Sequence, residues 1–197
     1  MTLFRKIISV LLITLFVPAA GAAPPPPRPD TGIGALLVRA APGATTPPVL
    51  VLYREPGIGR IAEKSVAACP NLASILKTPA DEFPLVVTAL KDGWMRVIYD
   101  DAGRAAWVEP FRRWPYLRWE EFLKGKQALL LRGLKKSHYV PRSGPDESAP
   151  ELEPLTPERS LRILEVAGDR IRVLIDLTVI GWLRWRDEDG RFLITLE

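Results

Sequence analysis

The sequence predicts a mostly β protein that consists of two small β units in tandem, preceded by a signal peptide and a proline-rich linker. Two observations predict this class. Apolar and polar residues alternate with a period of two in short runs from Val49 onward, as they do in half-buried strands. Turn residues such as Asp92 and Gly93 separate the runs, as they do in antiparallel hairpins.

Residues 1–22 have the pattern of a secretory signal peptide, because a basic start is followed by the apolar run 7–17 and by small residues up to Ala22. A helix over that run would rise about 16 Å, too little to cross a hydrocarbon core of roughly 30 Å. We therefore expect cleavage between Ala22 and Ala23. The mature protein is expected to be periplasmic or secreted, with no membrane span.

Residues 23–48 form the predicted linker, since this stretch is rich in proline and contains no aromatic residue. Such a composition favours an extended tether over packed structure. An apolar island at 33–39 interrupts it and could cover an exposed strand edge. The folded units are expected to begin only at Val49.

Charge and composition exclude several function classes. Removing the two basic residues of the signal peptide lowers the formal net charge from +4 to +2, too weak to favour nucleic acid or an anionic membrane as partner. One cysteine and one histidine exclude a structural zinc site, a multi-histidine metal site and an internal disulfide. We expect no metal and no cofactor, and we expect Cys69 to be buried and inert.

The first unit is predicted at 49–114. Its predicted strands are 49–53, 85–90, 94–100 and 104–108, with hairpin turns at 91–93 and 101–103. Residues 67–76 are expected to form a single helical turn or a long loop. The spacing of apolar residues over 115–124 is roughly helical, so a connector at 115–125 is predicted between the two units.

The second unit is predicted at 126–197. It repeats the pattern of short strands and tight turns, with strands at 161–166, at 170–176 and from Gly181. Aligning Leu85 with Leu161 without a gap superimposes the two meanders. The matched positions are then Arg96 with Arg172, Val97 with Val173, Asp100 with Asp176 and, after a one-residue deletion, Trp107 with Trp182. This match suggests an internal repeat.

The segment from Lys91 to Val108 resembles the core of a bacterial SH3-like domain, with Gly-Trp, a valine-rich strand, an acidic-glycine turn and a small residue before Trp-Val. Tyr53 before a Pro-Gly turn is similar to the family's opening strand, and the second match rests on 173–183. The resemblance implies a five-stranded, partly open barrel for each unit. Such domains are commonly found in secreted or envelope proteins that bind peptides or cell-wall material, and the resemblance does not imply an enzyme. We expect no catalytic activity.

Exposed indoles are good stacking surfaces for peptides or sugars, because they offer a large apolar area at low entropic cost. Trp94 lies beside a turn and shares its strand face with Arg96. Trp182 and Trp185 are expected on opposite faces of a strand, so that only one is buried. The candidate ligand-binding residues are Tyr53, Trp94, Arg96, Tyr139 and Trp185. The expected core residues are Val97, Trp107, Val173 and Trp182.

The leading hypothesis is a non-catalytic module of the cell envelope that recognises a peptide or a peptidoglycan fragment through exposed aromatic residues. A second hypothesis is docking on another envelope protein, motivated by the apolar seams at 129–131 and 177–180. A cysteine peptidase that uses Cys69 and His138 is disfavoured, because these residues fall in different units. The acidic run 187–189 has the pattern of a hairpin turn rather than of a metal site.

Overall fold

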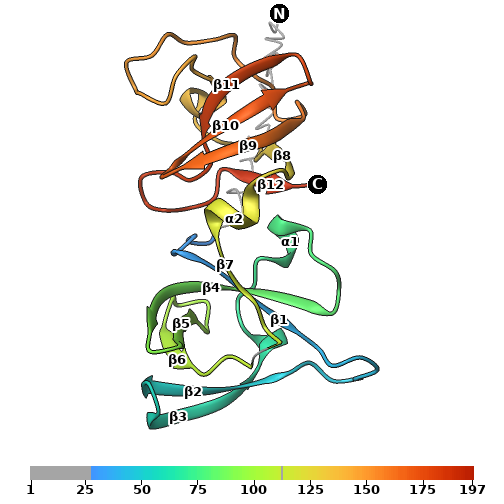
Figure 1. Cartoon of the computed structure of the whole chain (residues 1–197), viewed down its shortest axis with the longest axis vertical. Helices are drawn as coiled ribbons and strands as arrows, with labels where there is room; N and C mark the ends of the chain where they lie inside the picture. The colour runs from blue at the N-terminus through green and yellow to red at the C-terminus, as the bar shows by residue number, and fades with distance from the viewer. Residues whose placement is uncertain (1–27, 112) are drawn as a thin grey trace, which may run out of the picture.

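The chain folds into two antiparallel β sheets in the computed structural model, which describes residues 28–111 and 113–197. Strands take up 44% of the structure and helices 9%, so the predicted mostly β class is confirmed. Within the described residues neither sheet closes into a barrel. The two sheets are stacked along the long axis of the molecule (Figure 1). The predicted signal peptide and the cleavage site at Ala22 and Ala23 lie outside the described residues.

Seven strands form the first sheet, in the order β3-β2-β6-β5-β4-β1-β7. Their bounds are β1 Gly34–Arg39, β2 Val49–Glu55, β3 Ile58–Ser65, β4 Glu82–Lys91, β5 Trp94–Ile98, β6 Ala105–Val108 and β7 Tyr116–Arg118. The β4–β5 hairpin turns through Asp92 and Gly93, whose φ angles are 49° and 81°. Two positive φ angles define the hairpin turn that matches the twist of its strands, and Asp-Gly suits it.

The expectation that residues 23–48 form only a tether is wrong for β1. This strand pairs with β4 along its whole length, from Gly34 opposite Val87 to Arg39 opposite Glu82, and with β7 on its other side. Its residues are buried up to Val38. The apolar island is thus an interior strand, because its run of apolar side chains can be buried on both faces.

The first sheet curls around its own core. Leu36 of β1, Leu50 of β2 and Val97 of β5 belong to one buried cluster, although β1 and β2 lie near opposite ends of the strand order. Only strong curvature of the sheet brings such strands together. Trp114 completes this cluster, and its Nε1–H donates a hydrogen bond to the carbonyl oxygen of Arg39.

The second sheet has five strands in the order β11-β10-β9-β8-β12. Their bounds are β8 Gln127–Leu130, β9 Leu161–Ala167, β10 Arg170–Ile175, β11 Val179–Arg184 and β12 Ile194–Leu196. The helical segments of the chain are η1 Val66–Ala68, α1 Ala73–Leu76, α2 Trp119–Leu123 and η2 Lys136–Tyr139. Among the described residues, no helix has the length and apolar character that crossing a bilayer would require.

The two sheets contain the same three-stranded meander. In the first, Arg96 lies opposite Trp107, and a bulge in β4 leaves Thr88 unpaired before Ala89. In the second, Arg172 lies opposite Trp182. The residues that face Val173 and Arg172 across β9 are Ile163 and Glu165, so that Leu164 is the bulged residue. The bulges therefore fall at positions that the sequence alignment matches.

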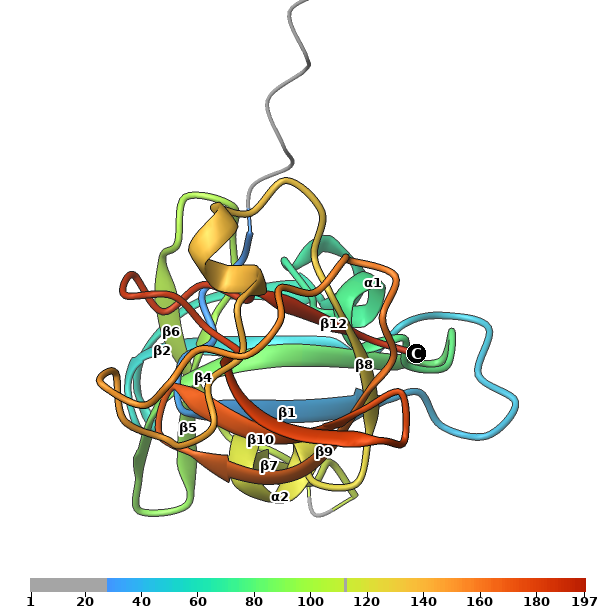
Figure 2. The same cartoon turned by 90° about the horizontal axis from the view of Figure 1, so that it is seen from above.

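A second core joins the two sheets. It combines Ala35 and Leu37 of β1 with apolar residues of α1, α2 and the second sheet. Figure 2, seen from above, shows β1 and β4 of the first sheet running in roughly the same direction as β9 and β10 of the second. Trp119, at the start of α2, belongs to this shared core. Its ring centroid lies 5.6 Å from that of Trp185 and 5.2 Å from that of Phe192.

Residues 28–33, which precede β1 and which we call the strap, connect the second sheet to the first. Arg28 forms an ion pair with Asp187 at 2.8 Å, and the Thr31 N–H donates to the carbonyl oxygen of Gly190 at 2.8 Å. The Thr31 carbonyl in turn accepts a hydrogen bond from Trp119 Nε1 at 2.8 Å. Part of the predicted linker thus belongs to the folded body.

Candidate ligand-binding face

The outer face of the first sheet carries a group of aromatic side chains. Tyr53 lies opposite Trp107, and Trp107 lies opposite Arg96 on the next strand. Directly opposed residues point to the same side of an antiparallel sheet. The next residues along these strands, such as Ala106 and Val97, belong to the enclosed core. The row of Tyr53, Trp107 and Arg96 therefore points away from that core.

Trp94 completes this group, which we call the aromatic face: Tyr53, Trp94, Arg96 and Trp107. The rings of Tyr53 and Trp94 meet edge to face, with 5.2 Å between centroids and 83° between planes. Both rings are half-buried. Trp107 is only 9% exposed but belongs to neither core cluster, so it is buried within this face rather than in the interior. Val97, in contrast, lies in the interior.

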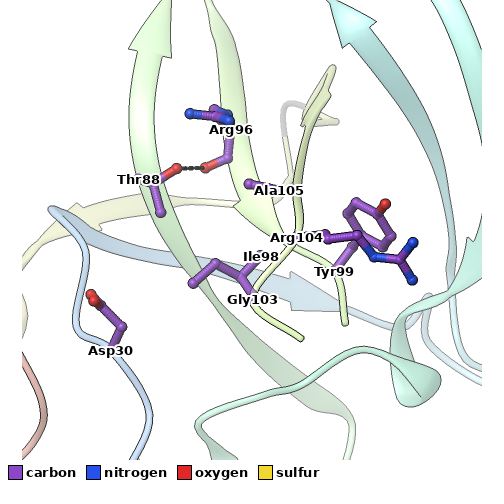
Figure 3. A pocket seen from close by; sticks show the side chains of 8 residues that line it. All are labelled: Asp30, Thr88, Arg96, Ile98, Tyr99, Gly103, Arg104 and Ala105. Carbon is purple, nitrogen blue, oxygen red and sulfur yellow. Dashed lines mark hydrogen bonds between the residues drawn. The ribbon is translucent and has the colours of Figure 1, made fainter. Parts of the chain in front are cut away.

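Arg96 is the charged member of the aromatic face. Its side chain is exposed, and it forms no ion pair with any residue that the structure describes. Its opposite neighbour on β4 is Ala89, which offers no carboxylate. The backbone at Arg96 is fixed by Thr88, whose hydroxyl donates to the Arg96 carbonyl oxygen at 3.2 Å (Figure 3).

An open hollow of about 550 Å³ lies beside the aromatic face. Its lining residues come from the outer face of β4 to β6, the β5–β6 turn and the strap: Asp30, Thr88, Arg96, Ile98, Tyr99, Gly103, Arg104 and Ala105. Figure 3 shows Arg96 and Asp30 at different ends of this group. The volume is within the range of small-molecule sites.

The other two charged residues that line this hollow, Asp30 and Arg104, already interact with other groups of the protein. Arg104 Nε contacts Asp100 Oδ2 at 2.5 Å. Desolvation opposes ionisation of Asp100, but the hydrogen bonds from the Arg104 backbone and guanidinium outweigh it and lower the pKa of the carboxyl. Asp30 Oδ1 accepts the Gly32 N–H at 2.6 Å in a tight turn. Of the two arginines that line the hollow, Arg104 forms an ion pair, whereas Arg96 forms none with any residue that the structure describes.

Sequence reasoning missed Asp30 because it lies in the predicted tether. The signal that could have found it is the run Pro29 to Gly32, because an aspartate two residues before a glycine commonly accepts its N–H in a turn. Ala89 and Thr88 were missed because a bulge can be recognised only once both strands are paired.

Two expectations for the second unit are wrong. Trp185, a predicted ligand-binding residue, is fully buried, and its Nε1–H donates to the Gly168 carbonyl oxygen at 3.0 Å. Trp182, predicted to be core, is only half-buried. The register explains both, since Gly181 opposes buried Val173 and so sets the odd-numbered residues of β11 inward. One indole of the pair is fully buried, as expected, but it is Trp185 rather than Trp182.

Tyr139 also has a structural position. Its hydroxyl donates to the Leu131 carbonyl oxygen at 2.7 Å and accepts the Leu134 N–H at 3.2 Å. The ring packs against the core that joins the sheets. A phenol held in this way ties down the loop after β8, and it is not presented for stacking with a ligand.

A second, smaller hollow of about 360 Å³ lies beside η2 and contains His138. Burial, together with the positive charge of Arg28, lowers the pKa of this imidazole. Asp187 in its wall accepts the backbone N–H groups of Asp189 and Arg191, at 3.0 and 2.9 Å, as in a hairpin turn. Across 28–111 and 113–197, no three His, Cys, Asp or Glu side chains are grouped in a way that could hold a metal ion.

Cys69 and His138 are not brought together. Cys69 is buried in the core enclosed by the first sheet, where its thiol faces the Ser65 carbonyl oxygen at 3.6 Å. His138 lines a hollow of the second unit. Burial raises the pKa of the Cys69 thiol, and nearby Lys64 only partly offsets this. The arrangement lacks the contact between nucleophile and base that cysteine peptidase chemistry requires.

No protein-family model matches the chain, and no curated protein gives a significant match.

Proposed function

We propose that this protein is a non-catalytic binding module of the cell envelope that recognises a peptide or a peptidoglycan-derived ligand through its aromatic face. The observation that carries the proposal is the edge-to-face pair of Tyr53 and Trp94 beside exposed Arg96. The neighbouring hollow extends the surface available to a ligand. The signal-peptide pattern of residues 1–22 supports a periplasmic or secreted location.

The aromatic pair suits stacking because its orientation is fixed before any ligand arrives. Trp107, which is nearly buried, lies beside Tyr53 on the neighbouring strand, and the two paired rings hold each other in place, so little side-chain freedom is lost on binding. Half-exposed Tyr and Trp combine apolar area with a polar group and often dominate binding energies. The guanidinium of Arg96 adds a charged hydrogen-bond donor at the margin of the same surface.

Each unit is proposed to be a divergent bacterial SH3-like domain. The sequence between Lys91 and Val108 supports this, as do the strong curvature of the first sheet and the bulged meander that both sheets share. In this proposal the second unit has lost the stacking role, since Trp185 and Tyr139 are taken up by packing.

Co-sedimentation with purified peptidoglycan tests the proposed function. Trp94→Ala should weaken binding at least about tenfold, because truncating an aromatic hot spot costs about 2 kcal/mol or more. The matched control is Trp182→Ala, which removes a half-buried indole from the second unit and should bind like the unmodified protein. Peptidoglycan that retains the unmodified protein no better than Trp94→Ala would refute the proposal.

A second candidate function is docking on another envelope protein. The β10–β11 turn favours it, because Leu177 is 72% exposed and Val179 and Ile180 are also exposed. Leu177 adopts a φ of 61°, which is unfavourable for a side chain of its size. Crosslinking in cells tests this candidate: a Leu177→Ser variant should lose the crosslinked partner, and detection of the monomer alone would count against docking.

A further inference from the structure

Arg96 and Arg172 occupy matched positions in the two meanders but have different neighbours. In the second sheet, Arg172 lies opposite Glu165, and the two side chains form an ion pair at 3.4 Å. In the first sheet, Ala89 lies opposite Arg96. The bulges at Thr88 and Leu164 fall just before these neighbours, so the strand register is matched in the two places. The second unit thus supplies a carboxylate that the first unit lacks.

The structure therefore assigns to Arg96 the role of carboxylate receptor: we propose that the ligand is a peptide whose carboxylate takes the place that Glu165 occupies beside Arg172. This inference rests on the proposed function, because it names the chemical group that the aromatic face recognises. A guanidinium matches a carboxylate with two parallel N–H···O bonds, which fixes orientation as well as charge. The apolar part of the peptide then lies over Tyr53 and Trp94.

The charges around the hollow favour a single carboxylate over a polyanion. Arg104 is paired with Asp100, and Asp30 adds a negative charge at another end of the hollow. A second negative charge on the ligand would approach Asp30 and be repelled. An ammonium or amide group of the ligand fits that end, as in a peptide that carries an amine as well as a carboxylate.

The decisive variant is Ala89→Glu, which gives the first unit the internal carboxylate of the second. The substitution should be tolerated because Glu165 is accommodated at the matched position of a matched bulge. It should weaken binding to purified peptidoglycan about tenfold by occupying Arg96 from within. Arg96→Gln should weaken binding to the same extent. Ala167→Glu, at an exposed alanine at the end of β9, controls for the added charge and should bind normally.

The second arm compares untreated peptidoglycan with peptidoglycan whose carboxyl groups have been converted to amides. The unmodified protein should bind the amidated material about tenfold more weakly. Equal binding to both materials would overturn the carboxylate inference and leave the proposed function standing. Binding to neither would refute the proposed function, and the inference with it.

Two further outcomes would also overturn the inference. One is a preference for untreated peptidoglycan that Ala89→Glu and Arg96→Gln both retain. The other is displacement of the protein by polyphosphate at lower concentrations than by polyglutamate, because that order indicates a polyanion site. A thermal unfolding midpoint close to that of the unmodified protein shows that each variant is folded.

Discussion

Truncation of Trp119 should show that the two sheets fold as one cooperative body. The ring is 2% exposed and touches Trp185, Phe192 and Phe122. Removing a buried tryptophan ring in Trp119→Ala costs about 3–5 kcal/mol. The variant also leaves the Thr31 carbonyl without its donor, which adds about 1–3 kcal/mol. The expected loss of unfolding free energy is therefore at least about 4 kcal/mol, a large share of the total for a protein of this size.

Urea unfolding followed by far-ultraviolet circular dichroism measures this loss. The unmodified protein should unfold in one transition, because residues of both sheets share a buried cluster. Trp119→Phe keeps most of the ring but not the Nε1–H donor, so its stability should lie between those of the unmodified protein and Trp119→Ala. Trp182→Ala should lower the free energy of unfolding by less than Trp119→Ala does, since that indole is only partly buried and belongs to neither core cluster. Two separate transitions in the unmodified protein, or a loss below about 1 kcal/mol in Trp119→Ala, would refute the shared core.

Three further predictions concern single residues. The folded protein favours neutral His138, because burial lowers the pKa of its imidazole. The stabilisation should therefore be complete above the unfolded pKa of about 6.5 and should be lost as the pH falls toward the lowered folded pKa. In urea titrations His138→Gln should flatten this pH dependence, and an unchanged slope would contradict the prediction. Cys69 should react with iodoacetamide at pH 7.5 far more slowly in the native protein than in urea, and equal rates would argue against its burial. Gly34→Ala would place a Cβ 2.4 Å from the Leu117 carbonyl oxygen, and should cost at least about 1–3 kcal/mol in thermal or urea unfolding; unchanged stability would show that β1 and β7 do not approach so closely.

The aromatic face could be predicted in part because its members are set by local alternation. Trp94 and Arg96 are two residues apart on one strand, so they share a side whatever the strand pairs with. That Tyr53 joins them depends on β2 pairing with β6, a contact between residues far apart in the chain. The opening-strand resemblance placed Tyr53 near the site, although period-two patterning alone cannot fix which strands are neighbours.

Strand β1 could not be predicted from its surroundings in the sequence. Prolines before and after it indicate a tether, and its partners come from β4 and β7, which lie much later in the chain. The apolar island itself was visible, but a run of four apolar residues does not say whether it covers an edge or enters a sheet. Asp30 was missed for the same reason, because the strap has a place only once the second sheet is packed against the first.

Trp107 and Trp182 occupy matched positions of the internal repeat but differ in burial, which the repeat alone does not predict. Both face an arginine across a matched pair of strands, so the repeat fixes their side of the sheet. Burial depends on the next strand outward. Beyond Trp107 lies β2, which places Tyr53 directly beside it, whereas the position beyond Trp182 is taken by Arg142 in an isolated bridge. Because Tyr53 is also a member of the aromatic face, the strand added beside β6 links the burial of Trp107 to the placement of the proposed binding face in the first unit.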